Sequence, residues 1–416
     1  MLSEELRIIG ERALEAKKQI SLLPTEVKNN ALCEVANKLV DNSSYIIEEN
    51  KKDIENGIAK GMSQGLLDRL LLDENRIRSM ADGLISVSKL PDPVGRTLDK
   101  FTRPNGLEIA KVSVPMGVIG IIYESRPNVT ADAFGLCFKS GNVVVLKGGS
   151  DAINSNIAIT EVIQNTLNDI GIDSNAIALI KSTDRSIAQE FMTMNGYIDV
   201  LIPRGSASLI NTVVKNSTVP VIETGAGNCH IYIDKEADLS KAVPIIINAK
   251  TQRLGVCNAC ESLVIHEEIK EQAMPLIAKA LLEKNVEIRA DKDIIDLCID
   301  AKPATEEDFA TEYLDSIISV KTVKCIEEAI EHINRFHTGH SDSIITENDD
   351  NAEKFLNEID SACVYVNAST RFTDGSEFGF GAEIGISTQK LHARGPMGLA
   401  ELNSYKYRII GNGQIR

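Results

Sequence analysis

The chain has 416 residues, of which 43% are hydrophobic and 25% charged, a balance typical of a globular protein with two or three domains of about 150 residues each. Its 60 acidic and 44 basic residues give a net charge of −16, which disfavours nucleic-acid and membrane-surface partners because both require basic patches. Eight cysteines are too sparse for a disulfide framework, and no apolar run approaches the ~20 residues of a membrane span. The N-terminus has early acidic residues and lacks the apolar stretch of a signal peptide, so we expect a cytoplasmic protein with reduced thiols.

Residues 1–89 carry a helical pattern, in which apolar residues recur every three or four positions from Leu6 to Ala16. Further helices are predicted at 24–39, 43–58 and 74–90. The segment Pro-Asp-Pro-Val-Gly at 91–95 ends this region, because no helix continues through it. Residues 103–114 then read as a turn followed by a strand.

From residue 117 short apolar runs alternate with amphipathic stretches. The runs predict strands at 117–123, 142–147, 177–180, 199–203 and 219–223. The stretches between them predict helices at 128–139, 152–167, 186–194 and 206–215. Such alternation indicates a parallel sheet that is covered by helices on both faces.

A second alternating series follows. It predicts helices at 239–250, 270–282, 325–336 and 351–359, with strands at 262–266, 317–321, 343–346 and 363–367. The fold class is therefore α/β, with two parallel-sheet domains, and the cleft expected between them is a usual place for a cofactor to meet a substrate.

The tail at 368–416 is rich in glycine and polar residues, and it ends in an alternating strand pattern at 404–410. Together with the strand at 103–114, this pattern could form an exposed sheet that pairs with another subunit. The alternative is a frayed terminus.

Cys257 is the best single candidate for a catalytic nucleophile. It lies in a loop between a predicted helix and a predicted strand, and nearby cations such as Arg253 or Lys250 would favour its thiolate. The alternative is a buried structural cysteine. The Cys257–Cys260 pair lacks a second pair of ligands for zinc, and it precedes a strand rather than a helix as a thioredoxin-like pair would, so we expect no metal.

Two turns between a strand and a helix could bind phosphate. Lys147-Gly148-Gly149-Ser150 offers an ammonium group and backbone N–H groups at the carboxyl end of a strand. The turn at 204–207, with Gly205 and Ser206, offers the same kind of site. The alternative for each is a solvated turn with a helix cap.

A third strand end carries Glu124-Ser125-Arg126-Pro127-Asn128. The side-chain amide of Asn128 could donate to a developing oxyanion. The alternative is that Asn128 caps the helix that follows it.

Longer blocks carry a specific resemblance. They are GVIGIIYESRPNVTADAFGLCFKSGNVVVLKGGSDA, TQRLGVCNACE, HSDSIIT, VNASTRFTDG and QKLHARGPMG. Together they resemble the gamma-glutamyl phosphate reductase family, also called glutamate-5-semialdehyde dehydrogenases, of the aldehyde dehydrogenase superfamily. The resemblance covers essentially the whole chain. It favours Cys257 as the nucleophile over the structural alternative, and the intact blocks disfavour both a different acyl substrate and a non-catalytic scaffold.

The resemblance implies an aldehyde-dehydrogenase-like fold in three parts. These are a cofactor-binding domain at 1–102 and 115–230, a catalytic domain at 231–385, and an oligomerisation flap formed by the 103–114 hairpin and the 386–416 tail. A homo-oligomer is therefore expected.

The implied reaction is the NADPH-dependent reduction of L-glutamyl 5-phosphate to L-glutamate 5-semialdehyde, the second step of proline synthesis. Cys257 would form a thioacyl intermediate, and Asn128 would help to hold the oxyanion. Glutamate 5-kinase, which makes the labile substrate, is a possible channelling partner.

The resemblance also assigns binding residues. Lys147 and Ser150 match positions for the adenine ribose and its 2′-phosphate, Gly205 and Ser206 the pyrophosphate, and Glu312 the nicotinamide ribose. Glu223 resembles the general base of oxidising relatives, which reduction does not need.

The substrate carboxylate is expected at the segment Ser369-Thr370-Arg371, with Arg126 and Arg253 as rival cations. Cys260 departs from the aliphatic residue that is usual in the family, and we hypothesise that it could act as a resolving thiol for Cys257.

Overall fold

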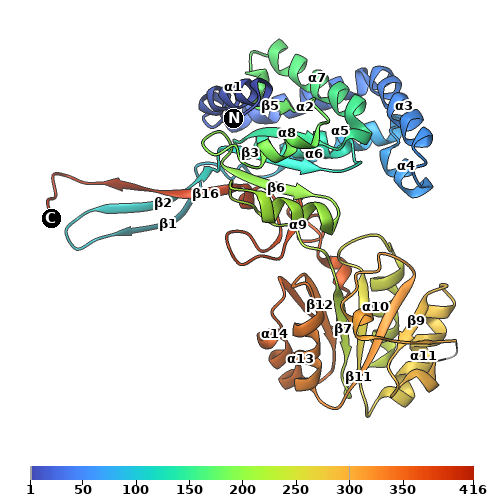
Figure 1. The fold of residues 1–416 in the computed structure, drawn as a ribbon. Helices are drawn as coiled ribbons and strands as arrows, with labels where there is room; N and C mark the ends of the chain where they lie inside the picture. The colour runs from blue at the N-terminus through green and yellow to red at the C-terminus, as the bar shows by residue number, and fades with distance from the viewer. Residues whose placement is uncertain (1, 299) are drawn as a thin grey trace. The chain divides into compact units, whose positions relative to one another are not determined.

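The computed structural model describes residues 2–298 and 300–416 of the chain (Figure 1). The chain divides into two compact units. The first unit comprises the chain up to Glu223 together with Gly379–Gly385 and Met397–Arg416, and the second comprises Thr224–Phe378 and Ile386–Pro396.

The first unit begins with five helices. They are α1 (Glu4–Ile20), α2 (Thr25–Asp41), α3 (Ser43–Ala59), α4 (Gln64–Leu70) and α5 (Glu74–Lys89). The apolar stripe of α1 is buried as predicted, with Leu6 and Ala16 inaccessible to solvent. Helix α4 was not predicted. It is short, and Leu70 is its one fully buried residue, so the helix has no repeating apolar pattern.

A four-stranded parallel sheet in the order β5-β4-β3-β6 forms the centre of this unit. Its strands are β3 (Val118–Tyr123), β4 (Val143–Gly148), β5 (Ile177–Leu179) and β6 (Val200–Arg204), and its helices are α6 (Asn128–Lys139), α7 (Ile153–Asp169), α8 (Arg185–Phe191) and α9 (Ala207–Asn216). Every residue of β3 and β4 is buried, as expected for a sheet that is covered on both faces.

The strand predicted at 219–223 is wrong. Val221 forms only an isolated bridge with Leu201. Pro220 accepts from Leu201 through its carbonyl but has no N–H to donate, so a regular ladder cannot continue through it.

A three-stranded antiparallel sheet also belongs to the first unit. It contains β1 (Thr97–Thr102), β2 (Glu108–Pro115) and β16 (Asn403–Ile410), with β2 in the middle. Figure 1 shows the three strands side by side, and the register runs from Asn403 opposite Pro115 to Ile410 opposite Glu108. The tail is thus a strand and not a frayed terminus.

The boundaries of the predicted flap differ from those of the structure. The segment at 103–114 was expected to be the hairpin, but the hairpin runs from Thr97 to Pro115. The predicted tail at 386–416 is divided, because Ile386–Pro396 belongs to the second unit. There β14 (Ile386–Ser387) and β15 (Gly395–Pro396) form a small antiparallel pair.

The second unit contains a seven-stranded parallel sheet in the order β10-β9-β11-β8-β7-β12-β13. Its strands are β7 (Cys229–Ile233), β8 (Cys260–His266), β9 (Glu287–Ala290), β10 (Lys302–Pro303), β11 (Ile317–Val323), β12 (Ser341–Ile345) and β13 (Cys363–Val366). Its helices are α10 (Leu239–Thr251), α11 (Lys270–Leu282), α12 (Glu306–Phe309), α13 (Ile326–Phe336) and α14 (Asp349–Glu358). Single turns of 3-10 helix occur in the two units at Ser150–Ala152 (η1), Ser174–Ala176 (η2), Ile295–Leu297 (η3), Thr370–Phe372 (η4) and Ala400–Leu402 (η5).

Strand β7 lies near the centre of this sheet and was not predicted. Its side chains alternate between two hydrophobic cores, with Ile231 and Ile233 in one and Tyr232 in the other. The polar residues Asn228 and His230 interrupt the apolar run in the sequence, although both are buried. The second unit therefore starts at Thr224 rather than at the predicted residue 231.

The α/β class and the two parallel sheets are confirmed. The cleft expected between the two domains stays a prediction, as do the roles assigned to each domain. Among the described residues no helix is long and apolar enough to cross a membrane.

Candidate active site

Cys257 lies in the loop between α10 and β8, and the start of β7 holds its backbone. The Cys229 thiol donates to the carbonyl oxygen of Cys257 across 3.2 Å. Gly227 packs against the same peptide, and an added Cβ there would lie 1.4 Å from the Cys257 carbonyl oxygen. The half-buried Cys257 side chain is therefore carried on a loop whose position is closely determined.

The segment Ser369–Arg371, which was expected to bind the substrate carboxylate, contacts this loop. The Thr370 hydroxyl donates to the Asn258 carbonyl at 2.8 Å, and the Asn258 amide donates to the Thr373 carbonyl at 3.0 Å. Thr370 is inaccessible to solvent, and the Ser369 hydroxyl accepts from the Arg371 N–H at 3.3 Å. Thr370 thus holds the loop and Ser369 caps the turn that carries Arg371, which does not favour their expected direct contact with a substrate.

Arg371 brings positive charge to the loop. Burial lowers the pKa of its guanidinium, whereas Asp374 and the ionised form of Cys257 raise it and Arg253 lowers it as a nearby cation. The Arg371 Nε donates to Gln252 at 2.9 Å. A cation close to a thiol favours the reactive thiolate form.

The structure does not favour Lys250, the other expected cation, as the source of that charge. Its ammonium group forms an ion pair of 2.5 Å with Glu261, and both side chains are inaccessible to solvent. Burial raises the pKa of Glu261 to about 7. This pair belongs to the interior of the second unit.

Glu312 lies next to the cysteine loop within the second unit. Its Oε1 accepts from the Gly227 N–H at 2.7 Å, and burial raises the pKa of the carboxyl group. Gly227 also packs against the Cys257 peptide, so Glu312 and Cys257 both contact the same glycine.

Cys260 is the first residue of β8 and is fully buried. Its thiol donates to the Ser262 carbonyl at 3.4 Å, and burial raises its pKa to about 12. A buried thiol in this state reacts slowly. The structure therefore does not favour the resolving role that we hypothesised for Cys260.

The first unit carries the predicted phosphate-binding turns. Lys147 is only 6% exposed, its ammonium group donates to the Gly148 carbonyl at 3.2 Å, and burial lowers its pKa. Ser150 begins η1 directly after β4 and is exposed. The turn thus combines a buried cation with an accessible hydroxyl.

Gly205 and Ser206 connect β6 to α9. The Ser206 hydroxyl caps α9 by accepting from the Leu209 N–H. The Ser206 N–H donates to Glu124 Oε2 at 2.8 Å, so this turn binds a carboxylate. An N–H group at a helix N-terminus is suited to an anion of this kind.

Asn128 is the first residue of α6 and does not cap it. Pro127 holds the cap position, without a side-chain hydrogen bond, so the capping alternative is wrong. The Asn128 amide donates to Asp132 Oδ2 at 2.9 Å instead. Arg126 is exposed on the same loop.

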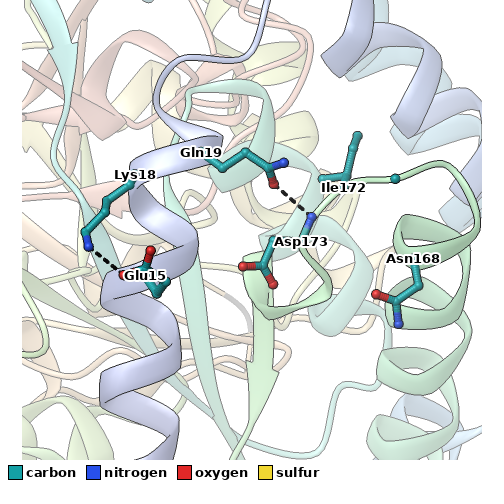
Figure 2. A pocket seen from close by; sticks show the side chains of 7 residues that line it. Glu15, Lys18, Gln19, Asn168, Ile172 and Asp173 are labelled. Carbon is teal, nitrogen blue, oxygen red and sulfur yellow. Dashed lines mark hydrogen bonds and ion pairs between the residues drawn. The ribbon is translucent and has the colours of Figure 1, made fainter.

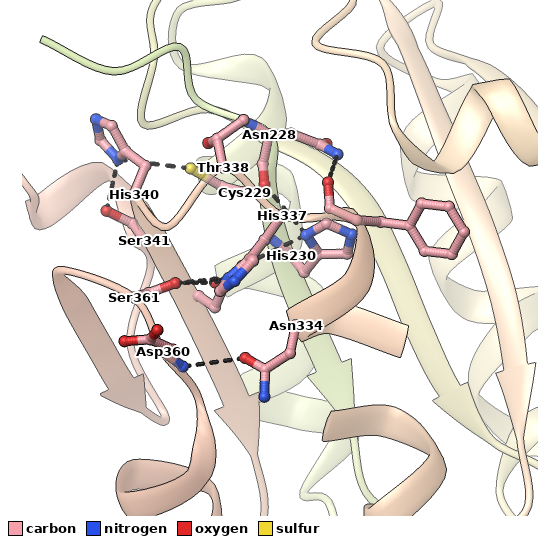
Figure 3. A network of polar contacts seen from close by, with 12 residues as sticks. Asn228, Cys229, His230, Asn334, His337, Thr338, His340, Ser341, Asp360 and Ser361 are labelled. Carbon is pink, nitrogen blue, oxygen red and sulfur yellow. Dashed lines mark hydrogen bonds and ion pairs between the residues drawn. The ribbon is translucent and has the colours of Figure 1, made fainter. Parts of the chain in front are cut away.

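A buried polar network that was not predicted from the sequence supports the start of β7 (Figure 3). Asp342 accepts from the His230 N–H at 2.7 Å and contacts His337 Nδ1 at 2.8 Å. Burial would raise the pKa of Asp342, but its hydrogen bonds with His230 and His337 hold that pKa well below its usual range. Since the partners are distant in sequence, no local spacing could have signalled them.

One cavity of about 580 Å³ in the first unit is lined by α1 and the end of α7 (Figure 2). Its residues are Glu15, Lys18, Gln19, Asn168, Gly171, Ile172 and Asp173. None of the predicted site residues lines it. Within residues 2–298 and 300–416, no group of three or more His, Cys, Asp or Glu side chains could hold a metal ion.

Comparisons with known proteins identify the family of the chain. The profile of the aldehyde dehydrogenase family matches residues 3–295 and 299–388. A gamma-glutamyl phosphate reductase of Lachnospira eligens is 60% identical over 413 residues, which cover 99% of this chain and all of that protein. The chain belongs to the gamma-glutamyl phosphate reductase family.

Solved structures extend this result. The crystal structure of a gamma-glutamyl phosphate reductase from Thermotoga maritima is 50% identical, with a TM-score of 0.98 over 99% of this chain and all of that one. An acetylating aldehyde dehydrogenase from Geobacillus thermoglucosidasius shares the fold, with a TM-score of 0.70 at 18% identity over 99% of this chain and 98% of that one. Membership of the gamma-glutamyl phosphate reductase family makes this chain an enzyme, an oxidoreductase with the aldehyde dehydrogenase fold.

Proposed function

We propose that this enzyme reduces L-glutamyl 5-phosphate to L-glutamate 5-semialdehyde with release of phosphate, using NADPH, as the second step of proline synthesis. The observation that carries the proposal is the cysteine loop of the second unit. Cys257 is held by Cys229 and Gly227 and lies within electrostatic reach of Arg371. A thiol fixed beside a cation is what nucleophilic attack on an acyl phosphate requires.

Cys257 is the nucleophile in this proposal. Its thiolate attacks the acyl carbon, a C–S bond forms, and the C–O bond to phosphate breaks with the electron pair leaving on phosphate. We assign stabilisation of the tetrahedral oxyanion to the Cys257 N–H and the side-chain amide of Asn128. The product of this step is a thioacyl group on Cys257.

Lys147, Ser150, Gly205, Ser206 and Glu312 are the residues that we assign to the cofactor. The fit is supported by the buried ammonium group of Lys147 and by the N–H of Ser206, which already binds a carboxylate. Bound NADPH would supply the hydride that reduces the thioester to the aldehyde. Lys147 is the residue that would favour a cofactor with a 2′-phosphate over NADH.

The α-carboxylate of the substrate needs a cation. Arg371 is supported by its proximity to Cys257 and Arg253 by its proximity to Arg371, and Arg126 remains a rival on the Asn128 loop. We assign Thr370 to positioning of the cysteine loop and Ser369 to positioning of Arg371. Arg371 thus has two proposed roles, in thiolate stabilisation and in carboxylate binding.

We further propose that the first unit binds the cofactor, that the second carries the catalytic cysteine, and that the enzyme works in the cytoplasm as a homo-oligomer. The β1-β2-β16 sheet supports the last point, since Leu98, Phe101, Tyr407 and Ile409 are exposed on it. The labile acyl phosphate makes channelling from glutamate 5-kinase a reasonable extension.

The reverse reaction tests the function. Enzyme, glutamate 5-semialdehyde and NADP⁺ are mixed with and without inorganic phosphate, and absorbance at 340 nm is followed. We expect steady NADP⁺ reduction only when phosphate is present. A rate that is independent of phosphate would indicate a hydrolytic aldehyde dehydrogenase and contradict the proposal.

A further inference from the structure

The carboxylate of Glu124 lies at the turn that we assign to the cofactor's pyrophosphate. Its Oε2 accepts from the Ser206 N–H at 2.8 Å, and its Oε1 accepts from the Ser206 hydroxyl at 3.3 Å. A Cβ added to Gly205 would lie 2.5 Å from Glu124 Oε2. The glycine therefore lets an anion approach the start of α9, and the chain itself supplies one.

A second hydrogen bond holds the loop that carries Glu124. The Ser125 hydroxyl donates to Asp151 Oδ2 at 3.1 Å, and Asp151 follows Ser150 in η1. The φ angle of Ser125 is +31°, in a region that residues other than glycine seldom adopt. The loop is thus held in a strained conformation between the two turns that we assign to the cofactor.

We propose that Glu124 is an internal competitor of the cofactor, whose carboxylate occupies the anion site at Gly205 and Ser206 until the pyrophosphate displaces it. The inference rests on the proposed function, because it requires a pyrophosphate-containing cofactor at this turn. A single N–H group cannot donate fully to two anions, and two negative groups at one helix N-terminus repel each other.

The competition between Glu124 and the pyrophosphate also affects the position of Asn128. Glu124 and Asn128 are four residues apart on one loop, and Asn128 begins α6. When the pyrophosphate displaces Glu124, that end of the loop is released from α9 and the strain at Ser125 can relax. Cofactor binding is in this way linked to the position of the proposed oxyanion donor.

The test measures equilibrium binding of NADPH to the wild-type protein and to Glu124→Gln by nucleotide fluorescence. Glutamine keeps an oxygen that can accept from Ser206 but removes the negative charge. We expect Glu124→Gln to bind NADPH about 3- to 10-fold more tightly. Adenosine 2′-monophosphate, which has no pyrophosphate, should bind both proteins equally when assayed by competition.

Two further variants secure the test. Glu124→Ala removes both the charge and the hydrogen bonds with Ser206, so its gain in NADPH affinity should be at least as large as that of Glu124→Gln. Glu34→Gln removes one negative charge from an exposed position on α2, and its NADPH affinity should equal that of the wild type. The melting temperature of each variant shows that it is folded.

Two results would overturn the inference. One is NADPH binding to both Glu124 variants that is no tighter than to the wild type. The other is an equal gain for adenosine 2′-monophosphate, which would indicate a general effect of charge. Failure of the proposed function is distinguishable from either result, because the wild-type protein would then bind no NADPH.

Discussion

The side-chain amide of Asn128 donates to the carboxylate of Asp132 across 2.9 Å, one helical turn along α6. One amide proton of Asn128 is engaged in this way, and the other remains for a second acceptor. Burial raises the pKa of Asp132 to about 6, against the opposing effects of Asn128 and of Arg204. Asp132 is therefore a residue that can position the proposed oxyanion donor in a pH-dependent way.

Asp132→Asn tests this positioning role. Below pH 6 the wild-type carboxylate becomes neutral and accepts more weakly, so kcat should fall as the pH drops from 7.5 to 5.5. The variant should have a kcat about 3- to 10-fold lower at pH 7.5 and should lack the part of the acid decline that Asp132 causes. The measurement is kcat against pH for both proteins, and superimposable profiles would contradict the role.

The stability of Asp132→Asn provides the control. The pKa of Asp132 is raised in the folded state above its ordinary value of 3.8, so its stabilising contribution is complete below about pH 4 and is lost as the pH rises through about 6. At pH 7.5 the charge of this half-buried carboxylate opposes folding. The variant should therefore melt no earlier than the wild type, and a lower kcat could not then be ascribed to unfolding.

Lys147→Met should separate the two nicotinamide cofactors. Loss of a charge-assisted contact of about 1.5–3 kcal/mol would weaken NADPH binding by roughly 10- to 150-fold. NADH has no 2′-phosphate, and its affinity should change by less than about threefold. Equilibrium binding measures both, with Lys38→Met on α2 as a cation control, and an equal loss for the two cofactors would refute the assignment.

Glu223→Gln should leave the reductive reaction nearly intact. Reduction ends in hydride transfer and needs no water activated by a base, so we expect kcat within about threefold of the wild type. The comparison is with Cys257→Ser under the same conditions. A loss in Glu223→Gln as deep as that in Cys257→Ser would mean that Glu223 takes part in reduction.

The buried ion pair of Lys250 and Glu261 predicts a large effect on stability. Lys250→Met leaves a fully buried carboxyl group without its cation and should destabilise the second unit by about 3–5 kcal/mol. Adding Glu261→Gln should recover much of that loss, because the isolated charge is removed. Urea denaturation followed by circular dichroism measures both, and equal midpoints for the single variant and the wild type would contradict the prediction.

Local pattern predicted most of the fold. The apolar runs of β3 and β4 and the stripe of α1 are the strongest local signals, and each formed as expected. The apolar pattern gave wrong predictions where a proline lacks the N–H that a strand needs, or where a buried polar side chain has a distant partner. Pro220 prevents a regular ladder within an apolar run. Strand β7 was not predicted because the polar residue His230 interrupts its apolar pattern, although His230 is buried and its N–H donates to Asp342.

The candidate site was predicted by resemblance and only partly by chemistry. Cys257, Arg371 and Glu312 come together within the second unit. The partner of each side chain was not predictable from spacing. The pairing of Lys250 with Glu261, and the contact of Glu124 with Ser206 across 82 positions, depend on tertiary structure that a single sequence does not display.

The central claim is that Cys257 becomes acylated during the reaction. Its most direct test is a single-turnover experiment with glutamate 5-semialdehyde and NADP⁺ in the absence of phosphate. We predict a burst of one NADPH per Cys257 at 340 nm, and mass spectrometry should find the glutamyl group on the peptide that contains Cys257. The addition of phosphate should then restart turnover, and Cys257→Ser should give no burst. A burst of equal size in Cys257→Ser, or an acyl group on another residue, would contradict the account.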